Sequence, residues 1–289
     1  QIPERNGLEL GMDVAVLKLV ASLITKNEKE KYLKQCIESL QGFVDEIRAV
    51  DDNSTDGTHS LMSEMGVKVH RNDRSVFYEH EGRARQQLLE WTMDAEPTHV
   101  LVVDGDELVV DGDQLRAKML EPQPFPSLRE RRQRGRSSYQ PATVWRLQMQ
   151  EVWGATEDHL LIRQDGGWKE HPVPICFAVP HMRHGDRQAI RHWRIPDKAL
   201  ACGRVPIEVA VASNRALNEA AATCLHLGWA CEADRWARHQ RYVVHDGGAH
   251  HASKHLDSIM WDNSRVHLTT RPWPEGVDKQ AILERINRT

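Results

Sequence analysis

The stretch Thr98-His-Val-Leu-Val-Val-Asp-Gly-Asp-Glu-Leu-Val-Val110 decides the fold of this chain. Val100 to Val103 is typical of a strand buried on both faces, and it stops at the acidic turn Asp104 to Glu107. Gly105 lets the chain turn without a Cβ, so we expect Asp104 and Asp106 to face one divalent cation. Mg²⁺ and Mn²⁺ typically combine one or two carboxylates with phosphate oxygens and water. The turn therefore predicts a site for a metal-bound nucleotide diphosphate.

Strands and helices alternate before this turn. We expect strands at Val14–Ile24, Val44–Val50 and Val67–His70, and helices near Tyr32–Leu40, His59–Met65 and Glu81–Met93. This alternation predicts a mostly parallel sheet flanked by helices, the α/β class. Ligands of such sheets bind beyond the carboxyl ends of the strands. Three polar segments follow those ends and should share one pocket: Thr25–Glu28, Asp51–Thr58 and Asp104–Glu107.

The organisation expected is a nucleotide-binding α/β half at residues 1–121, a loop at 122–141, and a mixed α/β and helical acceptor-binding region at 142–289. The loop is rich in proline and arginine, and we expect it to be mobile, either as a solvated insertion or as a lid over an anionic ligand. Eight of the nine tryptophans lie at or after Trp145. The expected elements there are strands at Ala142–Gln150, His159–Arg163 and Val173–Val179 and helices at Ile207–Cys224, Glu232–Val244 and Ala252–Trp261.

Composition excludes several classes of protein. A formal net charge of -4 argues against a chain whose main partner is nucleic acid. Five widely spaced cysteines without a Cys-x-x-Cys pair disfavour a disulfide framework or a zinc site and favour the reducing cytoplasm. No apolar run approaches the roughly 20 residues that a membrane span needs. Whether the chain forms a homo-oligomer is left open.

Four motifs in order resemble the family 2 glycosyltransferases with the GT-A fold, which use nucleotide-diphosphate sugars as donors. They are Thr25-Lys26-Asn27-Glu28, Val50-Asp51-Asp52-Asn53-Ser54-Thr55-Asp56-Gly57-Thr58, Ala84-Arg85 and Asp104-Gly105-Asp106-Glu107. The resemblance implies that Asp51 contacts the base of the donor, with Arg85 beside it, that Asp104 contacts the ribose, and that Asp106 binds Mn²⁺ or Mg²⁺. It also places Thr25, Asn27, Glu28 and Gly105 in the donor site. Arg85 is followed by Gln86 where asparagine is usual.

The second half offers candidates for the remaining roles. A base that activates the acceptor must be a carboxylate or a histidine near the anomeric carbon. Asp158 and Glu170 are the two candidates, and Trp168 beside Glu170 offers a face on which a sugar could stack. A further metal ligand could come from His226, with His171 and His184 as alternatives.

The resemblance thus implies a metal-assisted enzyme that moves a sugar from a nucleotide-diphosphate donor, for example a UDP-sugar, to a small or soluble acceptor. It also implies that the configuration of the anomeric carbon is inverted. A nucleotidyltransferase on a related fold is the second interpretation. It would normally need a loop rich in glycine and lysine, and Gly7 to Gly11 is too sparse. A third interpretation is a nucleotide-sugar-binding protein without catalysis.

Overall fold

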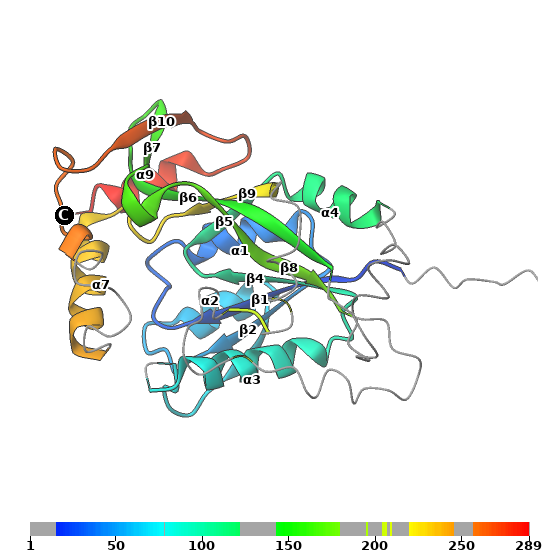
Figure 1. Cartoon of the computed structure of the whole chain (residues 1–289). Coiled ribbons are helices and arrows are strands. Elements are labelled where there is room, and N and C mark those ends of the chain that lie inside the picture. Colours follow the sequence, from blue (N-terminus) through cyan, green and yellow to red (C-terminus); the bar gives the residue numbers. More distant parts are fainter. Residues whose placement is uncertain are drawn as a thin grey trace, which may run out of the picture.

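The computed structural model describes residues 16–77, 79–121, 143–179, 195, 204–206, 209, 220–245 and 257–288. Within these residues the strands join into one sheet of ten strands (Figure 1). No helix in this described part is long and apolar enough to cross a membrane. The predicted loop 122–141, the candidate His184, most of the predicted helix at Ile207–Cys224 and the first half of the predicted helix at Ala252–Trp261 lie outside the described residues.

Four parallel strands from the first half form the centre of the sheet, in the order β4-β1-β2-β3. They are β1 (Leu19–Thr25), β2 (Glu46–Asp51), β3 (Lys68–Arg71) and β4 (His99–Asp104). The helices between them are α1 (Leu33–Gln41), α2 (Thr58–Glu64) and α3 (Glu81–Met93). The alternation predicted for this half is confirmed, with the first strand beginning five residues later than Val14.

Helices cover both faces of this parallel region. Alternate residues of β1 point in opposite directions, so Leu19 and Leu23 pack in the cluster that contains Leu33 and Ile37 of α1. Ile24 faces the other way, into a cluster with Leu88 of α3. Burial on both faces explains why these strands are nearly continuous apolar runs. It also leaves the strand ends as the place where polar residues can gather.

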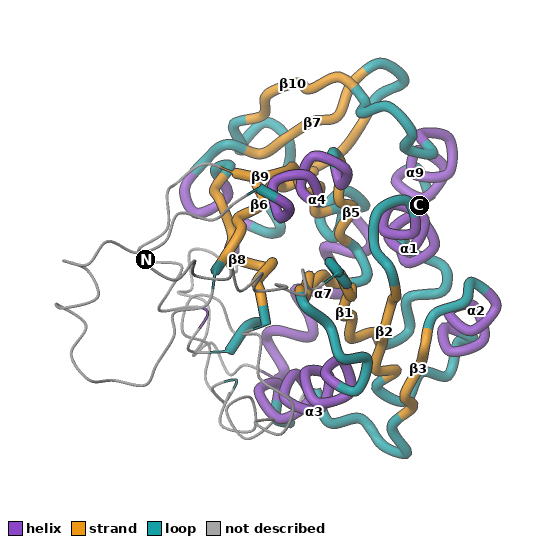
Figure 2. Tube along the Cα trace, turned by 90° about the vertical axis from the view of Figure 1, so that its right-hand side faces the viewer, coloured by secondary structure: helices purple, strands orange, loops and turns teal. Residues whose placement is uncertain are grey.

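Strands from the second half extend the same sheet beyond β4. Figure 2 shows them on the side of β1 away from β3. They are β8 (His171–Ala178), β6 (Val144–Ala155), β7 (His159–Arg163) and β10 (Leu268–Pro272), all antiparallel to their neighbours on this path. β5 (Glu107–Val110) pairs with β9 (Ala220–His226), and β9 also pairs in parallel with β6. Two further helices flank this region: α4 (Gly112–Leu120) and α9 (Lys279–Ile286).

The predicted helix at Ile207–Cys224 is wrong at its end. Ala220 to Cys224 belong to β9, between β5 and β6. The run Ala-Ala-Ala favours helix by itself, but pairing on both edges gives this segment its extended conformation. The helix predicted at Glu232–Val244 is confirmed as α7 (Glu232–His245), which stands beside the sheet at the left of Figure 1.

Three of the tryptophans form a buried cluster. The rings of Trp153 and Trp229 both pack on Trp168, with centroids 5.6 and 5.0 Å away. The guanidinium of Arg163, which is fully buried, lies 4.3 Å from the centroid of the Trp153 ring. Trp168 is only 4% exposed, and its indole nitrogen donates to Ser258. The face expected to stack on a sugar is therefore covered by protein, because the tryptophans support one another.

Candidate functional site

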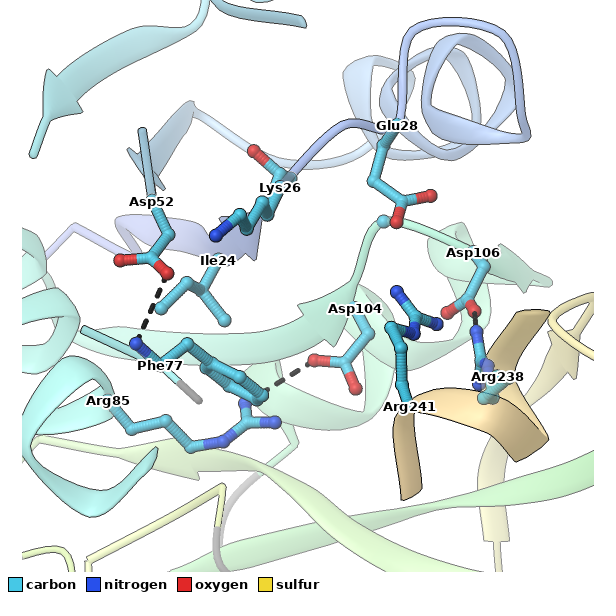
Figure 3. A pocket seen from close by; sticks show the side chains of 12 residues that line it. Ile24, Lys26, Glu28, Asp52, Phe77, Arg85, Asp104, Asp106, Arg238 and Arg241 are labelled. Carbon is cyan, nitrogen blue, oxygen red and sulfur yellow. Dashed lines mark hydrogen bonds and ion pairs between the residues drawn. The ribbon is translucent and has the colours of Figure 1, made fainter. Parts of the chain in front are cut away.

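A pocket opens where the parallel strands β1, β2 and β4 end (Figure 3). Its walls come from the first loop, from the acidic turn after β4 and from α7, which arrives from the second half of the chain. The lining residues are Ile24, Thr25, Lys26, Glu28, Asp52, Phe77, Arg85, Asp104, Gly105, Asp106, Arg238 and Arg241. The pocket thus combines the three segments that were expected to meet with Arg238 and Arg241 of α7, which none of the sequence motifs indicated.

The loop after β1 is held in shape by the loop after β2. Asn27 has a left-handed backbone with φ 55°, and its amide oxygen accepts from the backbone of Thr55. The backbone nitrogen of Glu28 donates to Thr58. These bonds turn Thr25, Lys26 and Glu28 into the pocket. Asn27 itself does not line it, so its contact in this structure is with the neighbouring loop.

Asp51 and Asp52 lie in different surroundings. Asp51 is fully buried, accepts from the backbone of Ser54 and lies 3.5 Å from Arg71. It does not line the pocket, so its predicted contact with a base finds no support in this geometry. Asp52 lines the pocket instead, and its carboxylate accepts from Ser75 and from the backbone of Phe77.

The network around Asp52 positions an aromatic wall. Its two oxygens also accept from Asn72 and from the backbone of Val76. Burial raises the pKa of Asp52, but these hydrogen bonds outweigh burial and bring the pKa below its usual value. The bonds fix the loop that carries Phe77. The Phe77 ring then lies 5.3 Å from the Arg85 guanidinium, which forms the adjacent wall (Figure 3).

Asp104 lies between two arginines. Its carboxylate is 3.3 Å from Arg85 and 3.0 Å from Arg204. Arg204 also pairs with the buried Glu107, whose other oxygen accepts from the backbone of Asp104. Burial raises the pKa of Asp104, and the two arginines outweigh it and lower the pKa below its usual value. Asp104 is therefore an ionised, well-anchored carboxylate at the end of β4.

Asp106 has a separate set of partners. It pairs with Arg238 of α7, and its Oδ2 lies 3.6 Å from Nε2 of His226 at the end of β9. Nδ1 of His226 is 2.6 Å from Glu151. Burial raises the pKa of Asp106, but Arg238 and His226 hold it well below its usual value. Burial lowers the pKa of His226, while Glu151 and Asp106 outweigh it and raise the pKa to about 10.

Arg238 is supported from two sides. Its guanidinium stacks 4.5 Å above the ring of Trp229. A Cβ added to Gly228 would lie 2.3 Å from Oδ2 of Asp106 and 2.6 Å from a nitrogen of Arg238, so glycine makes room for the pair. Arg235, Arg238 and Arg241 recur every three residues of a predicted helix, and this spacing was the signal that could have identified a basic face.

The candidate bases from the second half lie elsewhere. Asp158 is exposed in the turn between β6 and β7. Glu170 lies 3.2 Å from Arg271, and Nδ1 of His171 is 2.8 Å from the backbone oxygen of Lys169. None of the three lines the pocket. The identity of the base stays a prediction.

This arrangement suits an anionic ligand that carries an aromatic group. Lys26, Arg85, Arg238 and Arg241 line the pocket with Asp104 and Asp106 at its centre (Figure 3). Phosphate oxygens can accept from such guanidinium and ammonium groups, and a flat base can stack against Phe77. The chain is thus an α/β protein with a basic and acidic pocket at the carboxyl edge of its sheet, where sheets of this class bind their ligands.

The profile of the family described as Glycosyl transferase family 2 matches residues 22–193, so the chain belongs to this family. This finding confirms the family and the α/β architecture of the GT-A class predicted from the motifs. No curated protein matches the chain.

Solved structures with a similar fold include two synthases. Glucosyl-3-phosphoglycerate synthase from Mycobacterium tuberculosis, in complex with Mn²⁺, UDP and glucosyl-3-phosphoglycerate, is 21% identical over 38% of this chain and 42% of its own, with a TM-score of 0.30. Mannosyl-3-phosphoglycerate synthase from Rubrobacter xylanophilus is 19% identical over 49% of this chain and 43% of its own, with a TM-score of 0.29. The similar region spans less than half of each structure.

Proposed function

We propose that this member of glycosyl transferase family 2 moves a sugar from a nucleotide-diphosphate donor, such as a UDP-sugar, to an acceptor hydroxyl, with Mn²⁺ or Mg²⁺ at Asp106. The observation that carries the proposal is the meeting of Asp104, Asp106 and Arg238 in one pocket at the end of β4. A diphosphate needs cations, and a metal-binding carboxylate beside basic side chains supplies them. The reducing cytoplasm remains the expected location, and four described cysteines are free and buried.

The residues at Asp106 fit a divalent cation. Nδ1 of His226 contacts Glu151, and Nε2 faces Asp106, which is the way a metal-binding histidine is commonly oriented by a second carboxylate. Among the described residues no group of three or more His, Cys, Asp or Glu side chains gathers around one point. Asp106 and the deprotonated Nε2 of His226 would hold the ion in place of their contacts with Arg238 and with each other, and its other positions would be left to phosphate oxygens and water. Such an ion neutralises charge on the departing diphosphate.

Other side chains of the pocket would bind the base, the ribose and the phosphates of the donor. Phe77 and Arg85 hold the base, with Asp52 fixing the loop that presents Phe77. Asp104, anchored by Arg85 and Arg204, accepts from the ribose hydroxyls. Arg238 and Arg241 lie where the phosphates would be and donate to their oxygens. Inversion of the anomeric carbon in one displacement is proposed from the family resemblance.

Isothermal titration with UDP, with and without Mn²⁺, tests the proposal. The wild-type chain should bind UDP more tightly with Mn²⁺, and Asp106→Asn should lose this dependence, since the amide keeps the shape but not the charge. Asp113→Asn on the exposed side of α4 is the matched control and should bind as the wild type does. Assays with UDP-sugars should release free UDP. Binding without any Mn²⁺ effect, or an unchanged Asp106→Asn variant, would contradict the metal assignment.

A further inference from the structure

A second hollow adjoins the first and shares part of its wall. Its walls include Lys31, Tyr32, Asp106, Asp234, Arg238 and Arg241. Asp106 and the two arginines line both hollows. A molecule in the second hollow would therefore lie beside the proposed diphosphate, where an acceptor must lie for its hydroxyl to reach the sugar.

Polar atoms in the walls of the two hollows lack hydrogen-bond partners. Tyr32, just before α1, is 1% exposed, and its hydroxyl is buried and unpaired. Oδ2 of Asp234, in the first turn of α7, is also buried and unpaired, while Oδ1 pairs with Arg285. Oε2 of Glu28, which lines the first pocket, is also buried and unpaired. Figure 3 shows the Glu28 carboxylate facing Asp106. A buried polar atom without a partner destabilises a protein.

The chemistry of these atoms selects the ligand. The unpaired oxygen of Asp234 in the second hollow can only accept, so it requires a donor and repels anions. Burial, and then Asp234, raises the pKa of Tyr32, which keeps its hydroxyl protonated and able to donate. Three cations also line this hollow: Lys31 lies 2.8 Å from Glu28, Arg238 pairs with Asp106, and Arg241 is shared with the first pocket, where the phosphates are proposed to bind. A hydroxyl group both donates and accepts, whereas a phosphate or carboxylate only accepts.

We propose that the second hollow is the acceptor subsite and that it takes a neutral, polyhydroxylated molecule, a sugar or polyol, whose hydroxyls bond to Tyr32 and Asp234. The proposal rests on the proposed function for its role in transfer. Phenylalanine at position 32 would fill the same space without leaving an unpaired hydroxyl, so this substitution tests whether the hydroxyl serves a ligand.

Binding to the full chain is measured by isothermal titration and saturation-transfer NMR, with the methyl α-glycosides of glucose, mannose and galactose as neutral probes. Glycerate and inorganic phosphate are the anionic probes. At least one glycoside should bind. Tyr32→Phe should weaken binding of the glycoside about threefold to tenfold, because it removes one hydrogen bond between uncharged groups. It should not lower the melting temperature of the protein. Asp234→Asn should weaken it about tenfold, and Asp113→Asn should leave it unchanged.

The same preparations are titrated with UDP and Mn²⁺, which separates the two proposals. Normal UDP binding without any glycoside binding, or with anionic probes bound in preference, overturns the acceptor subsite and leaves the donor site standing. Glycoside binding that Tyr32→Phe and Asp234→Asn do not weaken also overturns it. Glycoside binding that responds to both variants, without UDP binding, supports the subsite and overturns the donor site.

Discussion

Gly228→Ala tests the contact between the acidic turn and α7 directly. Gly228 is not at a positive φ, so the cost of alanine comes from space and not from backbone strain. The new Cβ would lie 2.3 Å from Oδ2 of Asp106 and 2.6 and 2.8 Å from the two terminal nitrogens of Arg238. The backbone oxygen of Asp106 accepts from Leu227, which limits movement of the main chain. The ion pair itself must therefore separate.

Two known effects bound the loss of stability that we expect in Gly228→Ala. Overpacking a well-packed site costs about 1–3 kcal/mol. Removing one partner of a buried ion pair costs about 3–5 kcal/mol, so a pair that is displaced but keeps both charges should stay below that range. We expect the free energy of unfolding to fall by about 1–3 kcal/mol, which lowers the melting temperature by about 2–10 °C.

Urea unfolding with linear extrapolation measures this change, and Gly42→Ala is the matched control. A Cβ on Gly42 meets nothing within 4 Å, and its φ of -71° is ordinary for alanine, so this variant should be unchanged or more stable by about 0.4–1 kcal/mol. Gly228→Ala should also weaken binding of UDP with Mn²⁺. If Gly228→Ala is as stable as the wild type, Asp106 and Arg238 do not pack closely against Gly228.

Other predictions concern the Asp52 network, acid stability and the catalytic base. Asp52→Ala removes four hydrogen bonds and should cost about 2–4 kcal/mol in urea unfolding; a loss below 0.5 kcal/mol would refute the network. Burial raises the pKa values of Asp45, Asp52 and Asp165, but hydrogen bonds to these carboxylates outweigh burial and lower the pKa values below the usual range. The three carboxylates therefore stabilise the folded chain above about pH 4, and this stabilisation is lost on further acidification. A chain that becomes more stable towards pH 3 would contradict this sign. Asp158→Asn should leave the rate of UDP release within about twofold of the wild-type rate, because the side chain is exposed outside the pocket. If Asp158→Asn or Glu170→Gln instead lowers that rate more than about tenfold, the substituted residue is the catalytic base.

Local patterns were sufficient for the first half of the fold. The apolar run of Val100 to Val103, interrupted by the acidic turn, predicted β4 and the place of the pocket, and the helix at Glu81–Met93 was predicted with its observed bounds. Parallel strands bring their carboxyl ends together, so the meeting of Thr25, Glu28 and Asp104 in one pocket followed from the topology. These features depend on residues that are close in sequence.

Patterns failed where neighbours in space decide the outcome. The segment Ala220–Cys224 has a helical composition but is a strand because β5 and β6 lie on its two sides. Asp51 and Asp52 are adjacent identical residues, and only the positions of Arg71 and the Ser75–Phe77 loop show which of them lines the pocket. Trp168 looked like an exposed sugar platform until its packing against Trp153 and Trp229 was known.

The sequence by itself determined the alternation of strands and helices, the family and the acidic turn with its two aspartates. Only the tertiary structure decided how those carboxylates are neutralised: Asp104 by Arg85 and Arg204, and Asp106 by Arg238 and His226. The physical reason is distance along the chain. Asp106 and Arg238 are 132 positions apart, and no periodic pattern of side chains records which of many arginines will arrive beside a given carboxylate once the sheet has formed.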